Sequence, residues 1–284
     1  MLERSSQASD KKEADGAGAA LRAPSITLPK GGGAIRGIGE KFAANPVTGT
    51  GSMSVPLATS PGRSGFGPQL SLSYDSGAGN GPFGFGWSLS LPSITRKTDK
   101  GLPQYFDREE SDVFILSGAE DLVPELRPDG GRFEDTATDP AFTIHRYRPR
   151  IEGLFARIER WTRHADGDIH WRSISKDNIT TWYGKTAESR IANPNDPAHV
   201  FSWLICESHD DKGNVIVYQY KEENSDSVDR YQAHERNRTA ETRSANRYLK
   251  YIKYGNRTPY YPCLKENEPL TPLPCEWLFE VVFD

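Results

Sequence analysis

Two glycine-rich stretches carry residue types found in phosphate-binding loops, but neither has the required spacing. A dinucleotide-binding loop follows G-x-G-x-x-G, and Leu89 stands where the third glycine after Gly84-Phe85-Gly86 would be. Gly184-Lys185-Thr186 resembles the end of G-x-x-x-x-G-K-T, but Ile179 replaces the first glycine. Neither stretch is followed by a helical pattern whose N-terminus would bind the anion. The sequence therefore predicts no nucleotide cofactor.

Nucleophile and metal motifs are also incomplete. The stretch Gly62-Arg63-Ser64-Gly65-Phe66 lacks the last glycine of a G-x-S-x-G elbow. Cys206 and His209 have the spacing of two zinc ligands, but no second pair accompanies them. Adjacent acids such as Glu109 and Glu110 would point to opposite faces of a strand and could not act on one substrate atom. We therefore expect no catalytic residue, no metal ligand and no cofactor, and hence a protein that is not an enzyme.

The elements that would position such residues are strands. Apolar and small polar residues alternate with a period of two, which is typical of half-buried antiparallel strands. Segment 200–207 is apolar on both faces and should be a central strand, whereas the charged segment 227–244 is interpreted as a surface loop. The predicted fold class is all-β, made of antiparallel hairpins. The predicted strands lie near 53–57, 70–74, 87–91, 112–116, 142–147, 154–160, 169–174, 179–183, 200–207, 215–220, 247–254 and 277–283.

The stretch GAGNGPFGFGWSLSLP, residues 77–92, combines a turn with a strand. Glycine and asparagine tolerate the positive φ of a tight turn, so we place that turn within residues 77–81, ended by Pro82. Gly84 and Gly86 then alternate with aromatic residues, as in a strand that a large ring approaches closely. We predict that this signature shapes the backbone and binds no ligand. Its members are Gly79, Asn80, Gly81, Pro82, Gly84, Gly86 and Trp87.

A weak repeat of aromatic strand, Asp/Gly/Asn turn and aromatic strand runs through residues 161–220. Such turns supply the positive φ that hairpins need, and facing side chains on neighbouring strands contribute about 0.2–1 kcal/mol per pair. Because a single hairpin is only marginally stable, successive hairpins should pack side by side. The residues that carry this repeat are Trp171, Trp182, Trp203, Asp211, Gly213, Asn214 and Tyr218.

Composition narrows the class of protein further. The 284 residues carry a net charge of -4, so no basic surface points to nucleic acid. No segment approaches the roughly 20 apolar residues of a membrane helix. Residues 1–25 contain few apolar residues and no Sec-type signal, so we predict a disordered lead before one β domain at 26–284. Among the three cysteines, Cys263 and Cys275 are the one pair considered for a disulfide bridge.

Long stretches of the chain resemble a known family. The run ITLPKGGGAIRGIGEKFAANPVTGTGSMSVPLATSPGRSGFGPQLSLSYDSGAGNGPFGFGWSLSLPSITRKTDKGLPQY, from Ile26 to Tyr105, is similar to the N-terminal domain of the Salmonella plasmid virulence protein B family. That domain also opens the B component of insecticidal Tc toxin complexes. DVFILSGAEDLVP is a further match, and WLICESHDDKGNVIVYQY with ANRYLKYIKYGN resembles the Tyr-Asp repeats of Rhs-type proteins. The resemblance covers residues 26–284.

The resemblance implies a structural, non-catalytic part of a hollow Rhs-like β-shell that encloses and delivers a C-terminal toxic enzyme. The implied partners are the remaining toxin chain or a C component that completes the shell, and a pore-forming A component. It implies no nucleic acid, no membrane insertion by this segment, and a secreted protein that stays cytoplasmic until its release. The family's transferase site, Glu-x-Glu with a Ser-Thr-Ser strand, has no counterpart here, so that activity is not carried over. Family members continue well beyond the equivalent of EWLFEVVFD, so the resemblance implies an incomplete shell.

An alternative function also fits the residues. A stand-alone β-rich module could bind glycans or proteins of a host surface through exposed aromatic rings such as Trp171 and Trp182. This alternative requires that those rings be accessible to a ligand.

Overall fold

The computed structural model describes residues 40–45, 49–117, 120–153, 155–262 and 271–284. Regular structure in these residues is mostly antiparallel β-sheet, which confirms the predicted fold class. The predicted disordered lead, residues 1–25, lies outside the described residues, and so does Cys263; Cys206 and Cys275 are free thiols. None of the helices in the described part of the chain has the length and apolar character needed to cross a bilayer.

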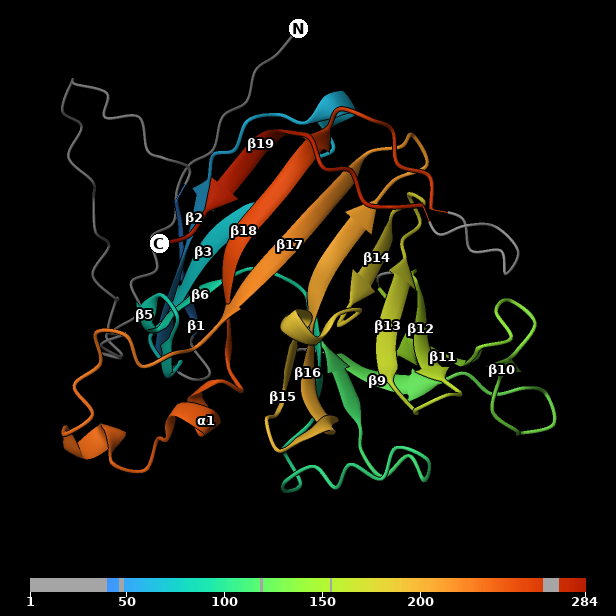
Figure 1. The fold of residues 1–284 in the computed structure, drawn as a ribbon, viewed down its shortest axis with the longest axis horizontal. Helices are drawn as coiled ribbons and strands as arrows, with labels where there is room; N and C mark the ends of the chain where they lie inside the picture. Colours follow the sequence, from blue (N-terminus) through green and yellow to red (C-terminus); the bar gives the residue numbers. More distant parts are fainter. Residues whose placement is uncertain (1–39, 46–48, 118–119, 154, 263–270) are drawn as a thin grey trace, which may run out of the picture. The chain divides into compact units, whose positions relative to one another are not determined.

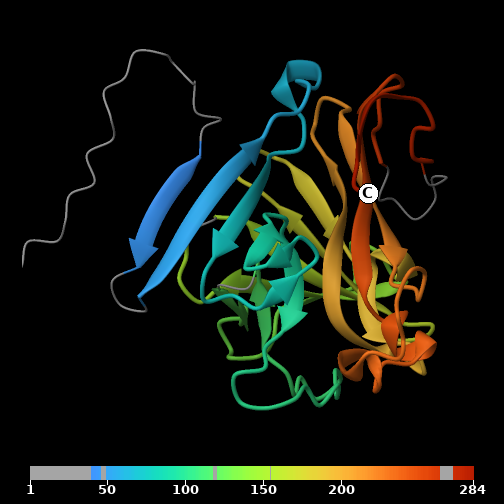
Figure 2. The ribbon, with the colours of Figure 1, turned by 90° about the vertical axis from the view of Figure 1, so that its left-hand side faces the viewer.

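A four-stranded sheet comes first along the chain (Figure 2). Its register places Met53 opposite Tyr74 and Tyr74 opposite Trp87, and the last two rings lie 5.2 Å apart. Serines occupy the other face, as the period of two requires. Leu70 packs into the core of the larger sheet. The strands run in the order β1 (Lys41–Asn45), β2 (Thr50–Leu57), β3 (Leu70–Asp75) and β6 (Trp87–Leu89).

The larger, 13-stranded sheet closes on itself (Figure 1). The closed ring contains, in spatial order, β14 (Thr180–Tyr183), β13 (Ile169–Ile174), β12 (Arg157–Arg163), β11 (Phe142–Pro149), β9 (Glu120–Pro124), β8 (Phe114–Leu116), β7 (Ser93–Arg96) and β16 (Asp196–His209). The ring closes because β14, the first strand in this spatial order, pairs with β13 on one edge and with β16 on the other.

The length of β16 makes both the ring and its extension possible. Residues Ser202–Leu204 pair with β7, and the end of the strand pairs with β14 on one edge and β17 on the other. Ile205 and Cys206 point to opposite faces and are both buried, which confirms the predicted central strand. The sheet continues beyond the ring through β17 (Val215–Glu222), β18 (Arg247–Asn256) and β19 (Trp277–Val282), while β10 (Glu134–Asp135) and β15 (Arg190–Asn193) pair with β11 and β16.

Aromatic rings fill the inside of the closed ring. Trp171 and Trp203 are 0% exposed, and Phe114 is 2% exposed. The ring centroid of Trp171 lies 4.9 Å from that of Phe114 and 6.0 Å from that of Trp203, both in edge-to-face geometry. Each such pair adds about 0.5–1.5 kcal/mol beyond the area that it buries. The interior is therefore a packed core.

A buried arginine fixes the loop between β7 and β8. Arg96 has a side chain that is 0% exposed, and its guanidinium donates hydrogen bonds at 2.7 Å to both Asp107 and Asp112. The same guanidinium stacks 4.7 Å from the ring centroid of Tyr105. Two carboxylates and one ring of the loop thus converge on a single cation in the core, which ties this long connection to the ring.

We predict that acid loosens this loop through Asp112. Burial alone would raise the pKa of Asp112, but hydrogen bonds from the backbone N–H groups of Gln104 and Tyr105, and the charge of Arg96, outweigh burial and lower it. A lowered pKa in the folded state stabilises the fold above about pH 4, and this contribution is lost as the pH falls through the folded-state value. The melting temperature of Asp112→Asn should therefore change less than that of the wild type between about pH 4 and pH 2.

The control for this prediction is Asp129→Asn. The Asp129 side chain is 65% exposed and lies 3.4 Å from Arg127, so its removal should leave the acid slope of the melting temperature unchanged. Equal slopes for Asp112→Asn and the wild type would contradict the role of Asp112.

The sequence pattern missed β1, β7, β9 and β15, which are short or carry charged residues among the apolar ones. The interpretation of segment 227–244 as a surface loop is also partly wrong. It holds the turn η3 (Ala233–Glu235) and the short helix α1 (Ala240–Arg243), and Arg243 is buried in an ion pair with Glu235. Charge alternation marked the segment as exposed because it does not reveal which charged side chain folds inward. The remaining turns are η1 (Arg63–Gly65) and η2 (Ala187–Ser189).

Candidate functional site

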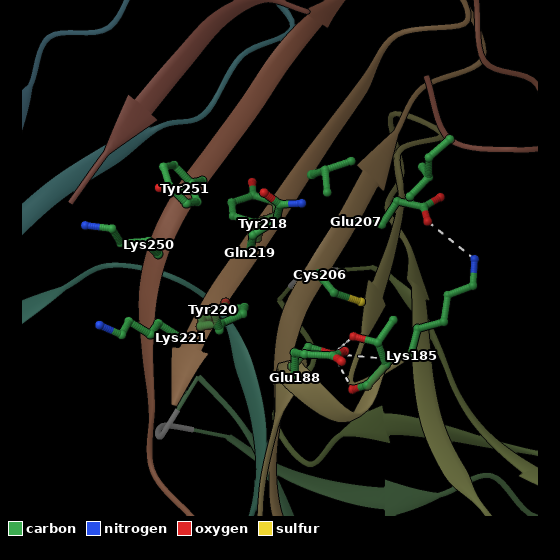
Figure 3. Close-up of a pocket in the computed structure, with 14 residues that line it drawn as sticks. Lys185, Glu188, Cys206, Glu207, Tyr218, Gln219, Tyr220, Lys221, Lys250 and Tyr251 are labelled. Carbon is green, nitrogen blue, oxygen red and sulfur yellow. Dashed lines mark hydrogen bonds and ion pairs between the residues drawn. The ribbon is translucent and has the colours of Figure 1, made fainter. Parts of the chain in front are cut away.

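A groove of about 850 Å³ lies over β16, β17, β18 and the η2 turn (Figure 3). Apolar rings and three lysines line it, with Lys221 and Lys250 on one side and Lys185 on the other. Of the predicted site residues, only Tyr218 lies in this lining. The lining residues are Lys185, Thr186, Glu188, Ser189, Cys206, Glu207, Val217, Tyr218, Gln219, Tyr220, Lys221, Lys250, Tyr251 and Leu273.

Glu207 is the charged group held most firmly in the groove. Its side chain is 4% exposed; it accepts a hydrogen bond from the Tyr260 hydroxyl at 3.0 Å and lies 3.3 Å from Lys185 Nζ and from His209 Nδ1. Burial alone would raise the pKa of Glu207, but the adjacent His209 imidazole and the Lys185 charge outweigh burial and lower the pKa. The carboxylate therefore stays ionised at neutral pH and holds the Lys185 side chain at the wall of the groove.

Burial keeps the Cys206 thiol and the Tyr218 and Tyr220 hydroxyls of the groove protonated at neutral pH. Burial raises the pKa of the Cys206 thiol to about 11, and the thiol donates a weak hydrogen bond to the Trp182 carbonyl at 3.3 Å. Burial also raises the pKa of Tyr218 and Tyr220, and the Tyr220 hydroxyl donates to the Ile205 carbonyl at 2.8 Å. Among the residues that the structure describes, no group of three or more His, Cys, Asp or Glu side chains is placed to hold a metal ion.

The signature residues 79–86 form a separate hairpin outside this groove, and Trp87 begins β6. Strands β4 (Asn80–Gly81) and β5 (Gly84–Phe85) pair Gly81 with Gly84, so Pro82 and Phe83 make a two-residue loop. Positive φ occurs at Gly84 (98°) and Gly86 (78°), so the prediction that residues 77–81 supply it is wrong. A positive-φ glycine directly after a tight turn is typical of a bulge, which the pattern of glycines alone does not locate.

We predict that Gly86→Val destabilises the protein by about 1–3 kcal/mol, because the site has no room for a side chain. A Cβ at Gly86 would lie 2.5 Å from Cε2 of Tyr74 and 2.9 Å from the Asp75 carbonyl oxygen. Gly84→Val is the matched control, since Gly84 also has positive φ but no atom within 4 Å of its Cβ position. Denaturant unfolding of both variants measures the difference, and equal losses would show that the Tyr74 contact has no effect.

The aromatic residues of the repeat lie in the core, so they cannot form the binding surface for host glycans or proteins that the alternative function requires. Trp171 and Trp203 are 0% exposed, Trp182 is 4% exposed and Tyr218 is 7% exposed. The Trp203 indole N–H donates to the Ile169 carbonyl at 2.8 Å. Rings buried to this degree cannot stack on a glycan, so the prediction that Trp171 and Trp182 are exposed binding residues is wrong.

The turn residues of the repeat lie in the β16–β17 hairpin, where two unpredicted side chains hold them. Asp210 accepts hydrogen bonds from the backbone N–H and side-chain amide of Asn214, at 2.9 and 2.7 Å. Asn256 is 0% exposed and links the turn to β18, since its amide donates to the Gly213 carbonyl at 2.9 Å. Asp211 stays on the surface. An Asx-turn pattern could have identified Asp210, but no local signal identifies Asn256 as the link to this turn, because its partner Gly213 lies 43 residues away.

The sequence profile of the family described as Salmonella virulence plasmid 65kDa B protein, SpvB, matches residues 45–284. The chain belongs to the SpvB family. The mono(ADP-ribosyl)transferase SpvB of Salmonella typhimurium and that of Salmonella dublin are each 38% identical to it over 264 residues. Each match covers 90% of this chain but only 42% of the relative.

Solved structures of SpvB-family proteins and toxin complexes have the same fold. The N-terminal domain of the effector protein SpvB from Salmonella typhimurium strain LT2 is 38% identical, with a TM-score of 0.69, over 81% of this chain and 71% of that chain. TcdB2-TccC3 is 34% identical, with a TM-score of 0.72, over 93% of this chain and 12% of that chain. The Photorhabdus luminescens Tc holotoxin pore gives a TM-score of 0.73 with the same identity and coverage.

These matches confirm that the chain is related to virulence and toxin proteins. They also correct the prediction about enzyme activity. The prediction that the chain is not an enzyme is wrong, because its curated relatives are named mono(ADP-ribosyl)transferases. The chain spans 42% of the length of those relatives. The structural neighbours are components of toxin complexes, which is the assembly context that the resemblance implied.

Proposed function

We propose that this chain forms a wall segment of the shell of a virulence toxin, and that the shell encloses and delivers a toxic enzyme. The observation that carries the proposal is the match to TcdB2-TccC3, which covers 93% of this chain and 12% of that chain. The fold described here thus recurs as one portion of a much larger toxin assembly. The remaining toxin chain or a C component would complete the shell, and a pore-forming A component would receive it after release from the cell.

The edge of β19 supports a role in a continuing wall. Among the described strands β19 pairs only with β18, so its outer backbone groups are open for a further strand. Leu278 is 50% exposed and Val282 is 48% exposed on one face of the strand. A further strand that paired with this edge would form backbone hydrogen bonds and would bury the exposed apolar side chains beside it.

The test is a chimaera in which this chain replaces the matching portion of TcdB2, assembled with TccC3. We expect the chimaera to protect the hypervariable C-terminal region of TccC3 from added protease, as TcdB2 itself should. The double variant Leu278→Lys with Val282→Lys should lose this protection, because it places two charges against the added strand. Glu280→Gln, on the same face between them, should keep it. A folded chimaera that leaves the TccC3 region open to protease would contradict the proposal.

The names of the relatives favour a second candidate, transfer of ADP-ribose by this chain itself. The test incubates the purified chain with labelled NAD⁺ and a host-cell extract. Label on a protein of the extract would assign the activity to this segment. Label that appears only with full-length SpvB would assign the activity to the part of SpvB that the match does not cover.

A further inference from the structure

The described part of the protein buries five arginine side chains, and one of them differs from the others. A buried guanidinium is costly unless a carboxylate faces it at hydrogen-bond distance. Four of the five meet this requirement: Arg96 lies 2.7 Å from Asp107, Arg172 lies 2.6 Å from Glu159, Arg190 lies 2.9 Å from Asp168, and Arg243 pairs closely with Glu235.

Arg160, on β12, is the exception. It is 3% exposed, and its Nε and Nη1 atoms have no hydrogen-bond partner. Its Nη2 atom lies 3.5 Å from Glu110 Oε1 and 3.4 Å from His145 Nδ1, both beyond the usual 2.7–3.2 Å of an N–H donor. Buried polar groups without partners are rare in proteins, and such a group needs a ligand, an ion or water to complete it.

Arg160 lies at one mouth of the closed sheet, beside a pocket of about 700 Å³. Thr143, His145 and Thr162 line the pocket from neighbouring strands, and residues 105–110 form its other wall. The Thr162 hydroxyl is also buried without a partner. Two side chains with unsatisfied hydrogen-bonding groups thus adjoin one space, at a place where closed sheets often bind small ligands.

Glu110 is the acidic group nearest to Arg160, but other contacts hold it. Its other carboxylate oxygen pairs with Arg132, and its backbone has a φ of 51°, a conformation that costs about 1–2 kcal/mol for a residue other than glycine. Glu110 therefore neutralises Arg132 and reaches Arg160 only at the limit of a hydrogen bond. The pocket still lacks a carboxylate or similar group placed directly on Arg160.

We propose that this pocket binds an oxyanion, which is a carboxylate or a phosphate group. The anion would accept the unpaired hydrogen bonds of Arg160 and would also pair with Arg132. Guanidinium groups bind both anions through paired N–H donors. The ligand displaces the Glu110 carboxylate from its long contact, so Glu110 competes with it. Thr162 then supplies a hydroxyl donor to the same anion.

The pKa of His145 reports whether the pocket is occupied, independently of a binding measurement. Burial lowers the pKa of His145, the Arg160 charge lowers it further, and Glu134 and Glu110 oppose the shift. An anion on Arg160 cancels that positive charge, so the pKa of His145 should rise when the ligand binds. The His145 ring resonance in an NMR pH titration follows this change directly.

The test titrates the purified chain with inorganic phosphate and, separately, with glutamate, at an ionic strength held constant with sodium chloride. We expect saturable binding of at least one of them and a rise in the His145 pKa. Binding of phosphate alone would assign a phosphate ligand, and binding of glutamate alone would assign a carboxylate. If neither anion binds saturably, or if His145 does not respond, the proposal is wrong.

Three variants separate this site from general charge effects. Arg160→Met should weaken binding at least about tenfold, whereas Glu110→Gln should tighten it about tenfold, because a competing charge is removed. Arg150→Gln is the control: Arg150 is 65% exposed and lies 3.3 Å from Asp121, so its loss should not change binding. Equal binding by Arg160→Met and Arg150→Gln would contradict the proposal.

The stability of Arg160→Met gives an independent check. If Arg160 is buried without a full partner, replacing it by an apolar side chain of similar length should leave the melting temperature within about 2 °C of the wild type or raise it. A large drop in the melting temperature would show that Arg160 is already satisfied in the free protein, and the proposal would fail on that result as well.

Discussion

Replacing Glu159 by Gln is expected to lower the free energy of unfolding by about 3–5 kcal/mol. The Glu159 side chain is 0% exposed and accepts hydrogen bonds from Trp161 Nε1 at 3.0 Å and from Arg172 Nε at 2.7 Å. Arg157 pairs with its other oxygen. The Arg172 side chain is only 4% exposed, so the amide would leave its charge buried without an opposite charge. Denaturant unfolding followed by tryptophan fluorescence measures the loss.

Two further variants show whether the buried charge is the cause. Glu280→Gln is the matched control, because Glu280 is 43% exposed and lies 3.7 Å from Lys253, and its loss should change stability by less than about 1 kcal/mol. Adding Arg172→Met to Glu159→Gln removes both buried charges and should recover much of the loss. A Glu159→Gln variant as stable as Glu280→Gln would show that the carboxylate is not needed.

Strands with strict alternation could be predicted almost to the residue. The segment 169–174 is β13 as predicted, and 215–220 lies within β17. Both strands have neighbours on each edge and are buried on both faces over their first residues, and such positions favour the apolar and aromatic residue types that indicate a strand. The closure of the sheet could not be predicted in this way. It depends on β16 pairing with β7 and β14, strands that lie far from one another in the sequence.

Strand β7, which the sequence pattern missed, strand β12, which was predicted three residues too early, and the candidate site have one cause in common, which is the burial of charged groups. β7 contains Arg96 and β12 contains Glu159, and a pattern search reads such residues as exposed. Each is buried because its partners come from other strands or loops. Arg160 belongs to the same class, and its lack of a close carboxylate becomes visible only when its neighbours are placed around it.

The incorrect prediction about enzyme activity has a different origin. The match covers 42% of the length of the curated relatives, and a motif missing from such a portion says nothing about the activity of a whole protein. Composition and alternation report on packing, which every segment of a protein must achieve. A catalytic site can lie entirely in another segment. Fold and core were therefore accessible from these residues, and the reaction was not.

Gly184→Ala is expected to destabilise the protein by about 3–5 kcal/mol, because a single methyl group would enter the packed core. A Cβ at Gly184 would lie 2.2 Å from Cδ1 and 2.8 Å from Cγ of Trp203. Trp203 cannot move away cheaply, since it is 0% exposed and its indole N–H is bonded to the Ile169 carbonyl. Gly184 itself is held by hydrogen bonds of its N–H to Leu204 and of its carbonyl to Arg190. Thermal and denaturant unfolding measure the loss.

Gly167→Ala separates this steric conflict from backbone strain. Gly167 lies in the turn between β12 and β13 and has a φ of 76°, close to the 62° of Gly184, but no atom lies within 4 Å of its Cβ position. Its variant should therefore lose only the roughly 1–2 kcal/mol that an L-residue costs at positive φ. The excess loss in Gly184→Ala measures how firmly Trp203 is packed. If the two alanine variants are equally stable, Trp203 can shift within the ring, and the interior is less tightly packed than the distances among Phe114, Trp171 and Trp203 indicate.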